Sequence, residues 1–108
     1  MNDQPEETRV GAGQDPSVPV LVRHLVICNR RGLHARAAAK FVTLAERFGA
    51  SVDVVKDGQA VSSRSIMGLM MLGAGIGSAI ELRAEGWDAK EAIEALAALV
   101  EAGFNEQE

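Results

Sequence analysis

Residues 34–49, HARAAAKFVTLAERFG, contain the most regular pattern of this 108-residue chain. Apolar side chains recur there at intervals of three and four residues: Ala38, Phe41, Val42, Ala45 and Phe48. This spacing places them on one face of an α-helix, and Gly49 is typical of the residue that follows a last turn. The stretch therefore predicts an amphipathic helix that must bury its apolar face against another element.

Short runs of β-branched and aliphatic residues lie on both sides of this helix. VLVRHLVIC (20–28) precedes it and ends at the polar NRRG (29–32), which predicts a strand and a loop. SVDVVKDGQAVSS (51–63) follows it, and the Asp57-Gly58 pair at its centre supplies the residue types that tolerate positive φ in a tight hairpin turn. AIELRA (79–84) alternates apolar and charged residues, so it predicts a fourth, half-buried strand.

Two further helices complete the pattern. SIMGLMMLG (65–73) has Ser65 in a capping position and Gly73 at its end, so it predicts a short helix whose apolar content exceeds one face. A closing helix begins at Asp88, with Glu91 three residues later in the spacing of a capping box. The order β-α-β-β-α-β-α predicts an α+β fold in which helices cover one face of an antiparallel sheet.

Composition divides the chain near residue 19. All three prolines fall in residues 1–19, among small and polar side chains, so this segment is predicted to be a flexible tail. Residues 20–108 are long enough to form one globular domain without disulfides or a structural metal. The single cysteine, Cys28, cannot pair within the chain, and we expect no metal and no cofactor.

Charge and hydropathy restrict the setting in which the chain works. The acidic N-terminus lacks the cationic and apolar pattern of a secretory signal, and no apolar run approaches the roughly 20 residues that cross a bilayer. We expect a cytoplasmic monomer without a membrane partner and, at a net charge of −4, without a nucleic-acid partner. Residues 20–65 nevertheless hold eight bases and three acids, so the middle of the chain is locally basic.

His34 is the candidate for chemistry, because it follows a glycine-containing loop and lies in the first turn of the predicted helix. Backbone N–H groups without partners attract anions there, and an imidazole offers an unprotonated, nucleophilic nitrogen near neutral pH. Arg36 lies close enough to contact phosphoryl oxygens, and Arg30, Arg31 and Lys40 add positive charge. Phosphoryl transfer needs little more than such positioning and electrostatics. An exposed helix start with a solvated basic face fits the same residues, and the local pattern does not choose between these interpretations.

Two segments together resemble a known family: GLHARAAAKFV (32–42) and SIMGLMMLG (65–73). They are similar to the histidine-containing phosphocarrier proteins (HPr) of the bacterial phosphoenolpyruvate-dependent phosphotransferase system, and the similarity covers residues 20–104. The resemblance implies an open-faced β-sandwich, with a four-stranded antiparallel sheet covered by three helices. It also implies that His34 takes a phosphoryl group on Nδ1 from phospho-Enzyme I and passes it to a IIA-type protein, with Arg36 as the active-centre arginine.

The resemblance implies a regulatory site as well. Ser65 looks like the serine that is modified in bacteria with an HPr kinase/phosphorylase, although any serine before a helix also serves as an N-cap and the two roles are compatible. Added negative charge at this helix start would leave the fold intact and act on recognition. The predicted partner surface consists of Ile66, Met67, Met70, Arg31 and Lys40.

The sequence departs from the commonest family pattern at Ala37, where proline usually follows the HAR triplet. This removes a rigid φ from the helix start, and phosphorylation chemistry should survive the change. The C-terminal ALVEAGFNEQE (98–108) looks like the nitrogen-related branch of the family. Together these features suggest a regulatory relay rather than sugar transport.

Two other classes of function compete with the carrier. A binding module of the same fold, controlled by modification of Ser65, would not need His34, and the presence of both His34 and Arg36 argues against it. A small phosphate-ester or acyl-phosphate hydrolase would need a residue that activates water, and no acid lies near His34 in the sequence. A carrier would be phosphorylated stoichiometrically, so it would not be an enzyme in the usual sense.

Overall fold

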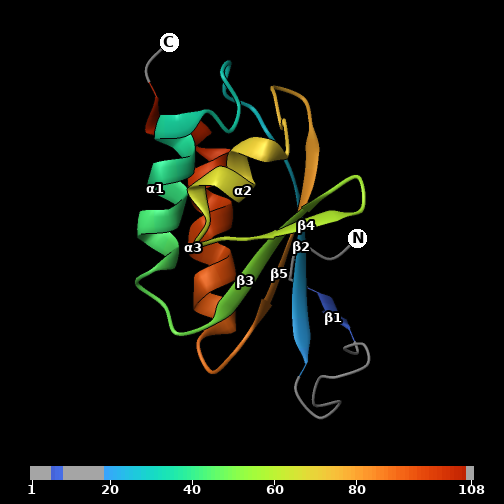
Figure 1. Cartoon of the computed structure of the whole chain (residues 1–108). Helices are drawn as coiled ribbons and strands as arrows, with labels where there is room; N and C mark the ends of the chain where they lie inside the picture. The colour runs from blue at the N-terminus through green and yellow to red at the C-terminus, as the bar shows by residue number, and fades with distance from the viewer. Residues whose placement is uncertain (1–5, 9–18, 107–108) are drawn as a thin grey trace.

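The computed structural model describes residues 6–8 and 19–106. The elements in chain order are β1 (Glu6–Thr8), β2 (Val20–Val26), α1 (Ala35–Ala45), β3 (Ser51–Lys56), β4 (Gln59–Ser62), α2 (Ile66–Met71), β5 (Ala79–Glu85), α3 (Ala89–Glu101) and the 3₁₀ turn η1 (Gly103–Asn105). The helices form one layer and the sheet forms the other (Figure 1). In this part of the chain, no helix combines the length and the apolar character needed to cross a membrane.

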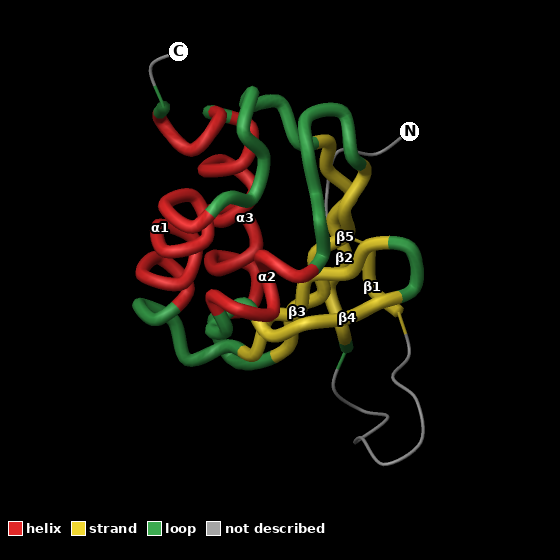
Figure 2. The backbone as a smooth tube through the Cα atoms, turned by 45° about the horizontal axis from the view of Figure 1, so that its top comes forward, coloured by secondary structure: helices red, strands yellow, loops and turns green. Residues whose placement is uncertain are grey.

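The sheet is antiparallel, with the strand order β1-β2-β5-β3-β4. The four predicted strands are present, and all three helices lie on one side of them (Figure 2), so the predicted open-faced α+β sandwich is confirmed. The short strand β1 is an addition that pairs with β2. The sequence predicted only a flexible tail over residues 1–19, because Glu6–Thr8 has no run of β-branched residues. The rest of that tail, residues 1–5 and 9–18, falls outside the described residues.

The core lies between the two layers. Alternate residues of the central strand β5, namely Ile80, Leu82 and Ala84, are buried, as the period of two predicts. The large side chains that are fully buried against them include Ile27, Phe41, Val54, Leu69, Ile93, Leu96, Val100 and Phe104. Each contributes about 1.5–3 kcal/mol through burial. This packing fixes α1 and α3 against the sheet.

The ends of the elements follow the sequence at some positions and not at others. The hairpin turn is confirmed, since Asp57 and Gly58 both have positive φ, 50° and 81°. The first long helix, however, ends at Ala45 with Glu46 as its C-cap, earlier than Gly49 indicates. The N–H of Phe48 donates to the carbonyl of Ala45, three residues back, so the chain tightens into 3₁₀-type turns before it reaches the glycine.

The predicted capping box at the start of α3 is wrong. Asp88 is the N-cap residue but makes no side-chain hydrogen bond to its own helix. Its buried carboxylate accepts hydrogen bonds from the N–H groups of Gly49 at 2.9 Å and Ala50 at 2.8 Å. Asp88 therefore ties the start of α3 to the turn that precedes β3.

Candidate functional site

His34 is the N-cap residue of α1. Its backbone is extended, with φ −71° and ψ 176°, and its carbonyl accepts the first helical hydrogen bond from Ala38 at 2.8 Å. No side chain caps this helix start, so its first N–H groups are available to an anion. The imidazole keeps 21% of its surface exposed, which leaves it accessible from solvent. The structure thus places His34 at a helix start, as the sequence predicts.

The loop before His34 is held against the loop that follows α2. Gly32 has φ +63°, and a Cβ at this position would lie 2.2 Å from the carbonyl oxygen of Ala74. Only glycine permits so close an approach in this conformation. The N–H of Leu33 donates to the same carbonyl at 2.9 Å, and the Leu33 side chain is buried. These contacts fix the backbone immediately before the imidazole.

A carboxylate contacts the imidazole from the far end of the chain. Nε2 of His34 and Oε2 of Glu106 are hydrogen-bonded to each other, and the two side chains form an ion pair when the ring is protonated. The residues are 72 positions apart in the sequence. No acid lies near His34 in the sequence and no local pattern marks Glu106, so the fold alone brings this carboxylate to the ring. The carboxylate contacts the ring nitrogen directly and so gives no support to the hydrolase alternative, in which it would have to activate water.

Asn29 joins this carboxylate to the loop. Its side chain is only 2% exposed, and its Nδ2 donates to the carbonyl of Gly32 at 2.9 Å and to Oε1 of Glu106 at 3.0 Å. Both oxygens of Glu106 are therefore hydrogen-bonded. Asn29 lies in the polar NRRG stretch, whose sequence predicted only a loop.

The surroundings of Glu106 act on its pKa in opposite directions. Burial raises the pKa, whereas the hydrogen bonds from Asn29 and His34, together with the charges of His34 and Lys40, lower it. The lowering contributions prevail, so the pKa of Glu106 lies below its ordinary value. Glu106 is consequently ionised at neutral pH.

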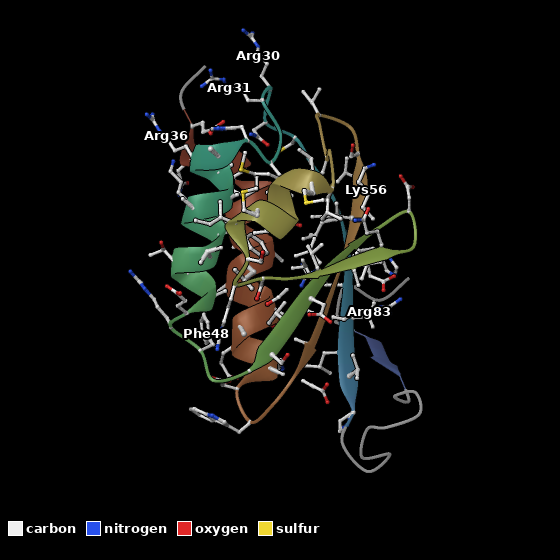
Figure 3. The ribbon with its side chains drawn as sticks, in the orientation of Figure 1. Arg30, Arg31, Arg36, Phe48, Lys56 and Arg83 are labelled. Atoms are coloured by element: carbon white, nitrogen blue, oxygen red, sulfur yellow. The ribbon has the colours of Figure 1, made fainter. Side chains whose placement is uncertain are left out.

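The predicted basic residues do not all play the same part. Arg30, Arg31 and Arg36 project from the end of the molecule where α1 begins, whereas Phe48 lies at the opposite end of that helix (Figure 3). The start of α1 therefore carries positive charge on its outer side. Lys40 instead donates a hydrogen bond to the carbonyl of Phe104 at 2.7 Å, so its ammonium group is engaged within the molecule.

Ser65 and the apolar residues after it form a second feature. Ser65 is the N-cap of α2, and its Oγ accepts a hydrogen bond from the N–H of Gly68 at 2.9 Å, so the predicted cap is confirmed. Leu69 is the buried residue of this short helix. Large apolar side chains are left exposed on and after it: Ile66, Met67, Met70, Met71 and Ile76. Of these, Met71 and Ile76 were not in the predicted partner surface.

Comparison with known proteins identifies the family. The model of the family described as "PTS HPr component phosphorylation site" matches residues 21–102. The chain belongs to the HPr family. It is 47% identical over 89 residues to phosphocarrier protein HPr of Cupriavidus necator, which covers 82% of this chain and 100% of that protein. It is 45% identical over 86 residues to phosphocarrier protein NPr of Shewanella violacea, which covers 80% and 94%.

A solved HPr structure agrees with this assignment. The crystal structure of HPr-C-His from Thermoanaerobacter tengcongensis matches with a TM-score of 0.77 at 45% identity, over 81% of this chain and 98% of that one. Membership in the HPr family makes this chain a phosphocarrier of the phosphotransferase system. Relatives named HPr and NPr have nearly equal identity, so the nitrogen-related branch stays a prediction.

Proposed function

We propose that His34 is the phosphoryl acceptor of this phosphocarrier, that phospho-Enzyme I is its donor and that a IIA-type protein takes the group from it. One observation carries this proposal. His34 is the N-cap of a helix start without a side-chain cap, and its imidazole is partly exposed. A phosphoryl group on this ring would meet free N–H donors and the positive end of the helix dipole.

The transfer asks for positioning and charge stabilisation. A ring nitrogen of His34 forms a bond to phosphorus while the bond from phosphorus to the donor breaks, and the electron pair of that bond leaves with the donor. The guanidinium of Arg36, two residues along α1, is the proposed partner of the phosphoryl oxygens. The N–H donors of this guanidinium and of the helix start would then stabilise the negative charge of the transferred phosphoryl group.

We further propose that partners dock beside this site on the exposed apolar side chains of Ile66, Met67 and Met70. Arg31 contributes charge at the same end of the molecule. A phosphate on Ser65, added by an HPr kinase/phosphorylase in a cell that contains one, would place negative charge at the edge of this surface and weaken recognition. The carrier acts in the cytoplasm as a monomer.

Intact-mass spectrometry tests the acceptor, since the chain has only two histidines. The protein is incubated with phosphoenolpyruvate and Enzyme I of its own organism, and the products are kept at neutral to alkaline pH. We expect one acid-labile phosphoryl group on the wild type and none on His34→Ala. The matched control is His24→Ala, whose histidine lies exposed on β2 and whose loss should leave phosphorylation intact.

Two results would contradict the proposal. Phosphorylation of His34→Ala would assign the acceptor to another residue. No mass change of the wild type with an active Enzyme I would leave the regulatory module controlled by Ser65 as the better hypothesis for this chain.

A further inference from the structure

The sheet has two edges, and the N-terminal strand β1 covers one of them. β1 pairs antiparallel with residues 20–22, from Glu6 opposite Val22 to Thr8 opposite Val20. It lies at the end of the strand order, outside β2 and beside the start of that strand (Figure 1). Without β1 the sheet would end at β2, and the backbone N–H and C=O groups on the outer side of β2 would lack partners in the sheet.

As an outer strand, β2 would have the properties that favour pairing with another chain. It is seven residues long, and five of the seven are valine or leucine. These side chains lie on both faces of the sheet, since Leu25 is buried in the core whereas its neighbour Val26 is 57% exposed. A long apolar strand with a free edge is a template for association with a further strand.

β1 has the opposite properties. It is three residues long, two of these are glutamates, and Pro5 precedes them. Short length, charged side chains and proline are the means by which proteins protect a sheet edge from further pairing. β1 therefore replaces a long apolar edge with a short acidic one. At the other edge of the sheet, β4 is also short, with four residues.

Covalent attachment favours β1 over a strand from another molecule. Residues 9–19 join β1 to β2, and a short tether gives the attached segment an effective concentration on the order of 1 mM. At micromolar concentrations of the chain, β1 therefore outcompetes an equally good strand of a second molecule. Loss of its pairing would leave the edge of β2 open to that molecule.

We propose that the edge of β2 is an interaction surface for a second copy of this chain, and that β1 keeps the chain monomeric by covering it. Two copies related by a twofold axis can pair their β2 strands antiparallel and join two sheets into one. With the axis at Val22, Leu21 lies opposite Arg23 and Val20 lies opposite His24. Residues of the same face then meet, and no like charges lie directly opposite each other. This pairing needs residues 20–22, which β1 occupies.

A variant of the full chain with a proline at each position of β1 tests the proposal: Glu6→Pro, Glu7→Pro and Thr8→Pro. Proline has no N–H group, so this segment can no longer donate hydrogen bonds to β2. The other four strands stay paired, because β1 lies outside them. The matched control has the same number of prolines immediately before β1: Asn2→Pro, Asp3→Pro and Gln4→Pro.

Light scattering after size-exclusion chromatography measures the mass of each protein at about 100 µM, about a tenth of the effective concentration of the tethered strand. The wild type and the control should have the mass of one chain, 11.4 kDa. The β1 variant should approach twice this mass. Adding Val20→Lys to the β1 variant should restore the mass of one chain, because a lysine on an edge strand opposes pairing.

Four results would overturn the proposal. The β1 variant could keep the mass of one chain, or its dimer could persist with Val20→Lys and so use another surface. A dimer of the control would assign association to the prolines themselves rather than to the loss of β1. Growth of the β1 variant beyond a dimer would exclude the twofold pairing.

The inference shares only the monomeric state with the proposed function and does not depend on the role of His34. A wild type that is already a dimer at this concentration would contradict both the role of β1 and the proposed monomer. Phosphorylation by Enzyme I is measured separately by intact mass. Its failure would overturn the role of His34 and leave the light-scattering result, and with it the role of β1, unchanged.

Discussion

The ammonium group of Lys40 donates a hydrogen bond to the backbone carbonyl of Phe104 at 2.7 Å. This bond connects α1 to the left-handed turn after α3. Glu106 follows that turn and contacts the imidazole of His34, the N-cap of α1. The helix α1 therefore holds both His34 and, through Lys40, the turn that carries Glu106. The sequence placed Lys40 in the predicted partner surface. In the structure its ammonium group instead makes a hydrogen bond within the molecule.

Replacing Lys40 by methionine should loosen this C-terminal turn and leave the core intact. The substitution keeps an unbranched apolar stem but removes a charge-assisted hydrogen bond worth about 1.5–3 kcal/mol. Hydrogen exchange is the measurement. The amides of Asn105 and Glu106, which donate to Ala102 and Gly103, should exchange about 10- to 100-fold faster.

The control for this experiment is Lys90→Met, which removes an exposed ammonium group from α3. It should leave the exchange of both amides unchanged. Equal protection in Lys40→Met and in the wild type would show that burial of Phe104 alone holds the turn.

Acid should release Glu106 from its partners before the domain unfolds. Because the pKa of Glu106 is lower in the folded protein than its ordinary value of 4.5, its contribution to stability is fully present above that value. The contribution is lost as the pH falls through the lowered pKa. The side-chain amide resonances of Asn29 report the loss, and we expect them to shift as the pH falls below 4.5.

The same acid titration of Glu106→Gln provides the comparison. Without an ionisable group at this position, the shift of the Asn29 amide resonances should be absent. A shift of equal size in the variant would assign the transition to another carboxylate.

The sequence predicted the features whose signals are local. The helical spacing in residues 34–49, the Asp57-Gly58 turn and the Ser65 cap each depend on residues that lie within a few positions of one another. The two segments that resemble the HPr family are equally local, and they led to His34. The structure confirms the hairpin turn and the Ser65 cap and places His34 at a helix start, whereas the role of His34 as acceptor stays a prediction.

The features that the sequence did not predict depend on residues far apart in the chain. Asp88 bonds to Gly49 across 39 positions, and Glu106 reaches His34 across 72. At Asp88, the local capping-box pattern predicted a hydrogen bond within α3, whereas the carboxylate bonds to Gly49 and Ala50. No periodicity or motif encodes such pairs, because tertiary packing alone brings them together.

Asp88→Ala should destabilise the domain through the loss of these long-range bonds. Two backbone N–H groups lose a charged acceptor, and that of the buried Ala50 is left without one, so we expect the free energy of unfolding to fall by about 2–4 kcal/mol. Glu91→Ala is the matched control, since Glu91 would matter equally in a capping box. It should change stability by no more than about 0.5 kcal/mol, as measured by urea denaturation. A larger loss in Glu91→Ala than in Asp88→Ala would restore the capping box.

Gly32→Ala should disturb the site as well as the fold, and Gly58→Ala separates the two causes. Both glycines have positive φ, 63° and 81°, so either alanine introduces about 1 kcal/mol of backbone strain. A Cβ at Gly58 meets nothing within 4 Å, whereas one at Gly32 lies 2.2 Å from the carbonyl oxygen of Ala74. Relieving that overlap adds about 1–3 kcal/mol and moves the loop that holds the His34 backbone.

Urea denaturation and the phosphorylation assay with Enzyme I distinguish these effects. Gly58→Ala should lose about 1 kcal/mol and accept phosphate at the wild-type rate, because its turn lies on the hairpin of β3 and β4. Gly32→Ala should lose more stability and also react more slowly under conditions in which it remains folded. Equal stability and equal rates in the two variants would mean that the loop before His34 yields without moving the imidazole, and that its contact with Ala74 does not position the acceptor.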